Sequence, residues 1–149
     1  MSIGKSLPHD AAPLHVTGQA RYIDDIALPA DALHLAFGLS TIAHGEIVAM
    51  DLSAVRAAPG VIGVWSAADF PDMPDCSPAG SNDEPLLANG RVHYVGQQVF
   101  LVSATSHLAA RKAARLAKIT YTERPALLTV DDALAANSRF ENGPVIWTK

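Results

Sequence analysis

The unbroken apolar run from Val99 to Val102 constrains the fold of this chain more than any other feature of the sequence. Gly96 precedes the run, and Ser103 and Thr105 follow it. A short apolar run with such boundaries is typical of a strand that is covered on both faces, because a half-exposed strand would alternate with polar residues. We therefore predict a strand here, in the middle of a sheet.

An alanine-rich stretch from Ser106 to Lys118 follows this strand and predicts a helix. Nearly all of its residues are good helix formers, and Ser106 is suited to cap the first turn. Helical spacing predicts a dry face of Ala109, Ala113, Leu116 and Ala117 and a wet face of His107, Arg111, Arg115 and Lys118. Residues 119–122 then alternate as a half-exposed strand. We expect a right-handed crossover with the two strands parallel.

A second, smaller strand-helix-strand unit precedes this one. Residues 33–40 predict a one-sided strand, with Leu33, Leu35, Phe37 and Leu39 on its apolar face. Residues 46–51 predict a strand, Ser53 is suited to cap a short helix over residues 54–58, and residues 61–65 predict a further strand. The expected fold class is α+β, a single domain with two strand-helix-strand units on one mixed sheet.

The remaining segments lack periodicity. We expect an extended N-terminal arm over residues 1–28, a globular domain over residues 29–137 and a tail over residues 138–149 that carries Trp147. Residues 66–89 hold four prolines and five acidic residues and predict a long irregular excursion, with one possible turn at residues 67–70. Loops of this length are usually functional or held by a partner.

Composition excludes several classes of protein. The chain has 149 residues, of which 49% are hydrophobic, enough for one domain with a real core. A single cysteine excludes an internal disulfide and a cysteine-built zinc or iron–sulfur site, and it favours a reducing compartment. The net charge of -4 and the scattered positive charges argue against nucleic-acid binding. Since no apolar run reaches the length of a membrane span or a signal peptide, we expect a cytoplasmic protein without membrane contact.

A search for reactive groups assigns no catalytic, cofactor-binding or metal-ligating residue. No metal-binding spacing such as H-x-H relates the six histidines, which are His9, His15, His34, His44, His93 and His107. Cys76 has no neighbouring base that would activate it as a nucleophile. The acidic pairs Asp24-Asp25, Asp83-Glu84 and Asp131-Asp132 are adjacent in sequence, so their side chains should diverge and act in caps and turns. Glycine-rich nucleotide loops are also absent from the sequence.

Two functional alternatives stay open on the residues alone. One is an acid/base site formed by Gln97, His93 and the Asp83-Glu84 loop, which requires these groups to converge within hydrogen-bond reach in one pocket. Gly96 would let the backbone turn sharply beside Gln97. The other is an interaction module that binds a partner through Arg111, Arg115 and Lys118.

A set of segments occurs in a characteristic order, namely residues 18–26, 33–37, 43–47, 59–61, 83–88 and 95–97 and then the alanine-rich helix. Together they resemble the α/β-hammerhead domain that begins the molybdenum-binding large subunit of xanthine dehydrogenases, within the aldehyde oxidase/xanthine dehydrogenase family. The two ends, residues 4–10 and 138–147, are similar to the bacterial form with separate subunits. One departure is Gln98, where the family commonly has proline.

This resemblance implies a hammerhead fold and a role in an oxidoreductase. The whole enzyme would be a molybdenum hydroxylase that converts hypoxanthine and xanthine toward urate in purine catabolism. Its molybdopterin would lie in the remaining domains of the large subunit, and FAD and 2Fe-2S clusters would lie on a small partner subunit. The present chain would be an inactive structural fragment without a cofactor or substrate of its own. The alternative within the same resemblance is an interaction module or a fragment of an aldehyde oxidase type of molybdenum hydroxylase.

Overall fold

The computed structural model describes residues 3–72, 74–78 and 84–139, which fall into two compact units, Met1–Ala32 and Leu33–Lys149. The first unit holds a short helix, α1 (Ala12–Val16), and a single 3-10 turn, η1 (Ile23–Asp25), with no buried residue in either. The prediction of an extended arm is therefore wrong at these two turns. Pro13 is compatible with the first turn of α1, and the Asp25 carboxylate accepts the Tyr22 N–H at 2.9 Å.

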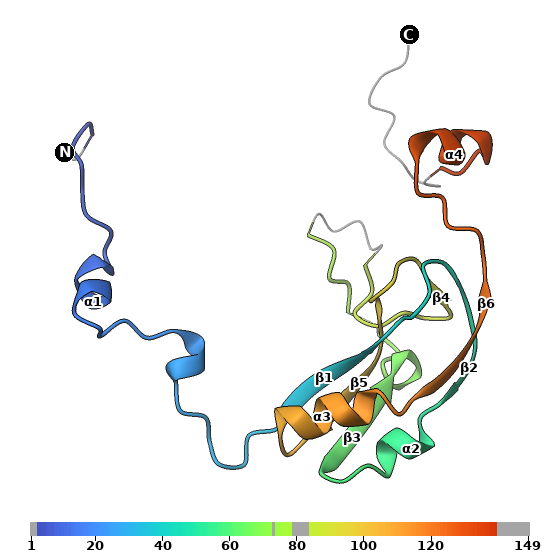
Figure 1. Cartoon of the computed structure of the whole chain (residues 1–149), viewed down its shortest axis with the longest axis horizontal. Helices are drawn as coiled ribbons and strands as arrows, with labels where there is room; N and C mark the ends of the chain where they lie inside the picture. The colour runs from blue at the N-terminus through green and yellow to red at the C-terminus, as the bar shows by residue number, and fades with distance from the viewer. Residues whose placement is uncertain (1–2, 73, 79–83, 140–149) are drawn as a thin grey trace. The chain divides into compact units, whose positions relative to one another are not determined.

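In the described part of the second unit, six strands form two antiparallel sheets (Figure 1). Sheet A has the order β1 (His34–Leu39), β5 (Gln98–Ala104), β3 (Val61–Ser66). Sheet B has the order β4 (Arg91–Val92), β2 (Gly45–Asp51), β6 (Lys118–Glu123). The α+β class is confirmed, whereas two antiparallel sheets take the place of the single mixed sheet.

Strand β5 is the central strand of sheet A, as the apolar run predicts. Its neighbours are β1 on one side and β3 on the other. Val99, Phe100 and Val102 are almost fully buried, and so is Ala104 at its end. The buried apolar cluster of the unit combines β5 with residues of both sheets and two helices, namely Leu52, Val55, Val64, Ala88, Val92, Val99, Phe100, Val102 and Ala113.

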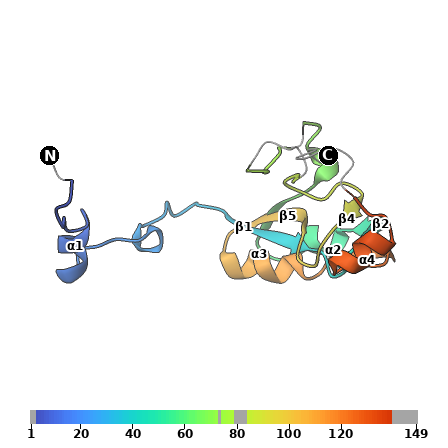
Figure 2. The same cartoon turned by 90° about the horizontal axis from the view of Figure 1, so that it is seen from above.

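The alanine-rich stretch forms helix α3 (His107–Ala114), which lies along one face of sheet A (Figure 2). The predicted cap is confirmed, because the Ser106 hydroxyl accepts the Ala109 N–H at 3.2 Å. The buried positions are Ala110 and Ala113, so the dry face is turned slightly from the predicted one. Leu116 lies beyond the end of the helix and is 46% exposed.

The predicted parallel crossover is wrong. Helix α3 leads from β5 in sheet A to β6 in sheet B, where β6 pairs with β2 antiparallel and Ile119 lies opposite Met50. Helix α2 (Ser53–Arg56) makes the same kind of connection in the other direction, from β2 in sheet B to β3 in sheet A. Each strand-helix-strand unit therefore joins the two sheets instead of extending one of them.

The start of α2 also differs from the prediction. Its N-cap is Leu52, and Ser53 is already inside the helix with no side-chain cap. The Asp51 carboxylate instead accepts the Ser53 N–H at 2.9 Å, and the Ser53 hydroxyl together with this N–H lowers the pKa of Asp51. The side chain that accepts a backbone N–H at the start of α2 is thus that of Asp51, two residues before the predicted cap, Ser53.

The one-sided strand β1 is present, but its large apolar face is the exposed one. Leu35, Phe37 and Leu39 are 57%, 39% and 50% exposed, whereas Gly38 is buried. Gly38 lies opposite Phe100 in the register, and a β-carbon added at Gly38 would meet the Phe100 ring at 1.9 Å. The small residues of β1 face the core because the bulky ring of Phe100 needs that space.

The excursion between β3 and β4 begins with the predicted turn, η2 (Ala67–Asp69), closed by the Asp69 carboxylate on the Ser66 N–H at 2.7 Å. Further along, the Cys76 N–H donates to the Glu84 carbonyl at 2.8 Å and the Leu86 N–H donates to the Pro74 carbonyl at 3.0 Å. These contacts draw the two sides of the loop together.

The last described element is helix α4 (Val130–Ala135), which the Thr129 hydroxyl caps through the Asp132 N–H at 3.1 Å, as predicted. Most of the predicted tail, including Trp147, lies outside the described residues. None of the described helices is long and apolar enough to cross a membrane.

Candidate functional site

One pocket of about 590 Å³ gathers most of the groups of the acid/base hypothesis. Its lining includes Glu84, His93 and Gln97, and Cys76 lies there too. Asp83, the remaining member of the hypothesis, lies outside the described residues. Three of these groups therefore line one pocket, but lining alone does not place their side chains within hydrogen-bond reach of one another. The position of Cys76 beside them was not predicted.

Gln97 has a structural role in this pocket. Its side chain is buried, and its Oε1 accepts the His93 N–H at 2.7 Å, while its own N–H donates to the Tyr94 carbonyl at 3.3 Å. Gly96 makes this turn possible with a φ of 89°, a left-handed value that favours glycine. The amide thus closes a tight turn ahead of β5, and its acceptor oxygen is already used.

The surroundings of His93 favour the neutral form of its imidazole. Partial burial lowers its pKa, and the nearby His44 and Arg91 lower it further. Within the described chain, no hydrogen bond joins the side chains of His93, Glu84 and Cys76 to one another. A catalytic base usually has such a bond to a nucleophile or to an orienting group. The pocket brings titratable groups together without connecting them into a relay.

A charged cluster lies on sheet B beside this pocket. Glu46 on β2 accepts with one oxygen, Oε1, from Arg91 Nη2 at 3.0 Å and from Arg124 Nη2 at 2.9 Å. All three side chains are more than a third exposed, so such pairs contribute only about 0–1 kcal/mol each. The cluster ties β2 to β4 and to the residue after β6.

Four of the histidines, which no metal-binding spacing relates in the sequence, lie in two pairs in the structure. His44 and His93 stack with ring centroids 6.0 Å apart, and His44 Nδ1 donates to the Pro125 carbonyl at 3.1 Å. His34 and His107 lie 6.5 Å apart at the start of α3. No sequence spacing could have indicated these pairs, because each joins residues from distant strands or loops.

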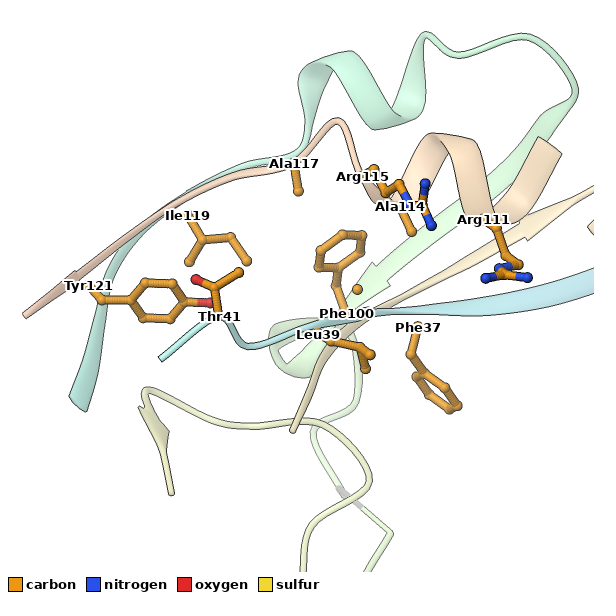
Figure 3. Close-up of a pocket in the computed structure, with 11 residues that line it drawn as sticks. Phe37, Leu39, Thr41, Phe100, Arg111, Ala114, Arg115, Ala117, Ile119 and Tyr121 are labelled. Atoms are coloured by element: carbon orange, nitrogen blue, oxygen red, sulfur yellow. The ribbon is translucent and has the colours of Figure 1, made fainter. Parts of the chain in front are cut away.

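A second pocket, of about 470 Å³, lies at the outer edge of β1 (Figure 3). Its apolar lining includes Phe37, Leu39 and Phe100, and Arg111 and Arg115 of the α3 segment border it. Tyr121 from β6 reaches it from the other sheet, and its side chain points toward Thr41 in the close-up. Burial raises the pKa of the Tyr121 phenol, and the neighbouring Ser40 and Thr41 offset part of this rise.

The charged stripe on α3 is exposed, as predicted. His107, Arg111 and Arg115 are exposed, and so is Lys118 at the start of β6. Within the described chain, neither Arg111 nor Arg115 has a carboxylate within 4.0 Å. Two guanidinium groups at the rim of an apolar pocket can each bind a carboxylate with directed hydrogen bonds.

The described residues do not fit a metal or iron–sulfur centre. Among them, no three His, Cys, Asp or Glu side chains lie together as ligands would. A 2Fe-2S cluster held by thiolates needs four cysteines, and the whole chain has one.

Comparison with known proteins gives consistent results. The family model described as "Aldehyde oxidase and xanthine dehydrogenase, a/b hammerhead domain" matches residues 17–125. Xanthine dehydrogenase of Oryza sativa subsp. japonica is 38% identical over 141 residues, which are 95% of this chain and 10% of that protein. Aldehyde oxidase 1 of Rattus norvegicus is 37% identical over 141 residues, which are 94% of this chain and 10% of that protein.

A solved structure agrees with the sequence matches. Quinoline 2-oxidoreductase from Pseudomonas putida 86 superimposes with a TM-score of 0.77 at 35% identity, over 93% of this chain and 18% of that one. The chain thus spans about a tenth of the length of the curated relatives it matches.

Proposed function

Because the chain belongs to the aldehyde oxidase and xanthine dehydrogenase family, whose a/b hammerhead domain it contains, we propose that it is a structural domain of a larger oxidoreductase. The observation that carries this proposal is the extent of the match. Almost the whole chain aligns with a tenth of each relative, so most of such an enzyme consists of other domains. The pocket around His93 supports the same view, because the Gln97 oxygen is used in a turn and, among the described residues, no hydrogen bond joins the His93 and Glu84 side chains.

The proposed whole enzyme is a xanthine dehydrogenase of the molybdenum hydroxylase type, acting on hypoxanthine and xanthine in purine catabolism in the cytoplasm. Molybdopterin would be held by the other domains of the molybdenum-binding subunit, and FAD and 2Fe-2S clusters by a separate partner subunit. The single cysteine supports this assignment of the clusters to another chain or segment, since it cannot ligate a cluster alone.

A second candidate is an enzyme of the aldehyde oxidase type. The identity to rat aldehyde oxidase 1, 37%, is almost the same as that to rice xanthine dehydrogenase, 38%. Substrate choice depends on side chains that touch the substrate. We propose that those side chains lie in the other domains, so the hammerhead residues do not separate the two candidates.

The test compares the 149-residue chain with the holoenzyme that contains it. Molybdenum content and the turnover of xanthine and of an aromatic aldehyde are measured on both. We expect metal and turnover only in the holoenzyme, with xanthine as the better substrate. Stoichiometric molybdenum in the short chain, or turnover by it, would contradict the structural role, and a preference for the aldehyde would favour the second candidate.

A matched pair of variants examines the His93 pocket in the same holoenzyme. The substitutions are His93→Asn and Glu84→Gln, which remove the imidazole and the carboxylate while keeping similar side-chain volumes. We expect kcat and its pH profile to stay unchanged in both. A loss of kcat of about a hundredfold or more, the usual effect of removing a general base, would instead favour acid/base chemistry in this pocket.

A further inference from the structure

We propose that the exposed face of sheet A and the pocket beside it form a docking surface for another domain of the same enzyme. The surface, called the docking face below, consists of Leu35, Phe37, Leu39, Trp65 and Leu101, with Arg111 and Arg115 at its rim. This inference rests on the proposed function, because it assumes polypeptide beyond these residues. The docked segment would supply apolar side chains and at least one carboxylate.

The strand register places the apolar residues on one face. Leu101 on the central strand lies opposite Phe37 on β1 and opposite Trp65 on β3, so the three form one row across the sheet. Alternation along β1 puts Leu35 and Leu39 on the same face as Phe37. Helix α3 covers the opposite face, where Phe100 and Val102 are buried.

The exposed apolar side chains on this face indicate that another polypeptide segment binds there. Leu35, Phe37 and Leu39 are between 39% and 57% exposed along a single strand. Leu101 and Trp65 on the neighbouring strands are half-buried, so the exposed apolar surface is concentrated on β1. Single exposed apolar residues are ordinary, but a contiguous group of them is typical of an interaction site. Trp65, in the same row across the sheet, is of a residue type that is enriched among the side chains that dominate interface energetics.

The pocket at the edge of sheet A can accept a side chain of the docked segment. Phe37 and Leu39 line it together with Phe100, and in Figure 3 the Phe37 and Phe100 rings lie on opposite sides of β1. Strand β1 is an edge strand of sheet A, so no other strand of the sheet covers this side. Phe37 and Leu39 belong both to the apolar face and to the lining of the pocket, so the two adjoin at the edge of the sheet formed by β1.

The two arginines indicate the charge of the partner. Both line the pocket, and within the described chain neither has a carboxylate partner. A protein surface that covered this pocket without a carboxylate would leave two guanidinium groups poorly solvated, at a considerable cost in free energy. The partner segment should therefore be apolar with an Asp or Glu positioned at Arg111 and Arg115.

The length of related proteins identifies the occupant. In the superimposed quinoline 2-oxidoreductase, the match covers 18% of that chain, so most of that polypeptide lies outside the matched domain. We therefore assign the docking face to a segment of the same enzyme outside these 149 residues. A second copy of the chain and an unrelated protein are the competing occupants.

The experiment is hydroxyl-radical labelling of the holoenzyme, read residue by residue by mass spectrometry. Tyr94, which is 54% exposed and lines the His93 pocket and not the pocket at Phe37, is the internal reference. We expect Phe37 to be labelled at least about tenfold more slowly, relative to Tyr94 and after correction for intrinsic reactivity, than its exposure here implies. Equal corrected labelling of Phe37 and Tyr94 overturns the proposal. Protection that disappears when a dimer is diluted to monomer also overturns it, because a second copy is then the occupant.

Variants separate docking from folding. Phe37→Asp and the double variant Arg111→Glu with Arg115→Glu should each raise the rate of proteolytic cleavage within this domain of the holoenzyme by about tenfold. Val48→Asp is the matched control, since Val48 is 61% exposed on β2 of the other sheet and should change little. Equal effects at Phe37 and Val48 would contradict the assignment of the surface. If the holoenzyme turns over xanthine while Phe37 is fully labelled, the docking proposal is wrong and the proposed function stands. If the 149-residue chain alone turns over substrate, the proposed function is wrong.

Discussion

The ring of Phe100 occupies the space above the α-carbon of Gly38, so that a β-carbon at position 38 would lie 1.9 Å from the ring. The two residues are partners in the register of β1 and β5. We predict that Gly38→Ala lowers the free energy of unfolding by about 1–3 kcal/mol, because the ring must move within a packed core. Urea titration of the purified chain measures this change.

The companion variant for this prediction is Phe100→Leu. Removing the ring makes room at position 38, so Gly38→Ala should cost less in the Phe100→Leu background than in the parent chain. If the cost is the same in both backgrounds, the contact between the two residues is not its cause.

The exposure of β1 predicts a contrast between two leucines. Leu87→Ala should lower the free energy of unfolding by about 2–5 kcal/mol, because Leu87 is fully buried. Leu35→Ala should cost less than about 1 kcal/mol in the isolated chain, because Leu35 is 57% exposed. A large cost at Leu35 would mean that its face packs inside the isolated domain.

The two capped helices predict different consequences of losing a cap. Ser106→Ala should lower the global free energy of unfolding by about 1 kcal/mol, since α3 contributes Ala110 and Ala113 to the interior. Thr129→Ala should leave global stability nearly unchanged, because α4 has no buried residue and can fray by itself. Amide exchange is the measurement: faster exchange confined to α4 is the expected signature for Thr129→Ala.

The lowered pKa of His93 predicts that acid weakens the fold. Unfolding restores the ordinary value of 6.5, so the unfolded chain takes up a proton at a higher pH than the folded chain does. The free energy of unfolding should therefore decrease as the pH falls through and below 6.5, and the loss should be complete once the pH is below the folded-state pKa. His93→Asn should flatten this dependence. A stability profile identical to that of the parent would show that other groups cause the acid sensitivity.

Local features of the fold were predictable because they depend on nearby residues. The apolar run at Val99–Val102 is typical of a central strand, and β5 is the central strand of sheet A, although Leu101 is only half-buried. The Ser106 hydroxyl acts on an amide three residues away. The sheet partner of β6 was not predictable in this way. A strand, a helix and a strand in succession do not determine whether the second strand returns to the first sheet or enters another.

The inverted face of β1 shows a second limit. Alternation indicates that Leu35, Phe37 and Leu39 share a face, but it does not say whether that face meets this core or another surface. The deciding contact is between Gly38 and Phe100, which are 62 residues apart in sequence. Similarly, the gathering of Glu84 and His93 in one pocket was a reasonable hypothesis, whereas the use of the Gln97 oxygen by a backbone amide depends on the local turn.

The interior cluster and its partly buried neighbours begin at Ile42 and end at Tyr121, and neither α1 nor α4 adds a buried side chain. A shortened polypeptide that runs from Leu33, where the second compact unit begins, to Pro125, whose carbonyl holds His44, therefore keeps every one of these apolar contacts. That segment is the natural starting point for NMR work on this domain and for grafting it into related enzymes.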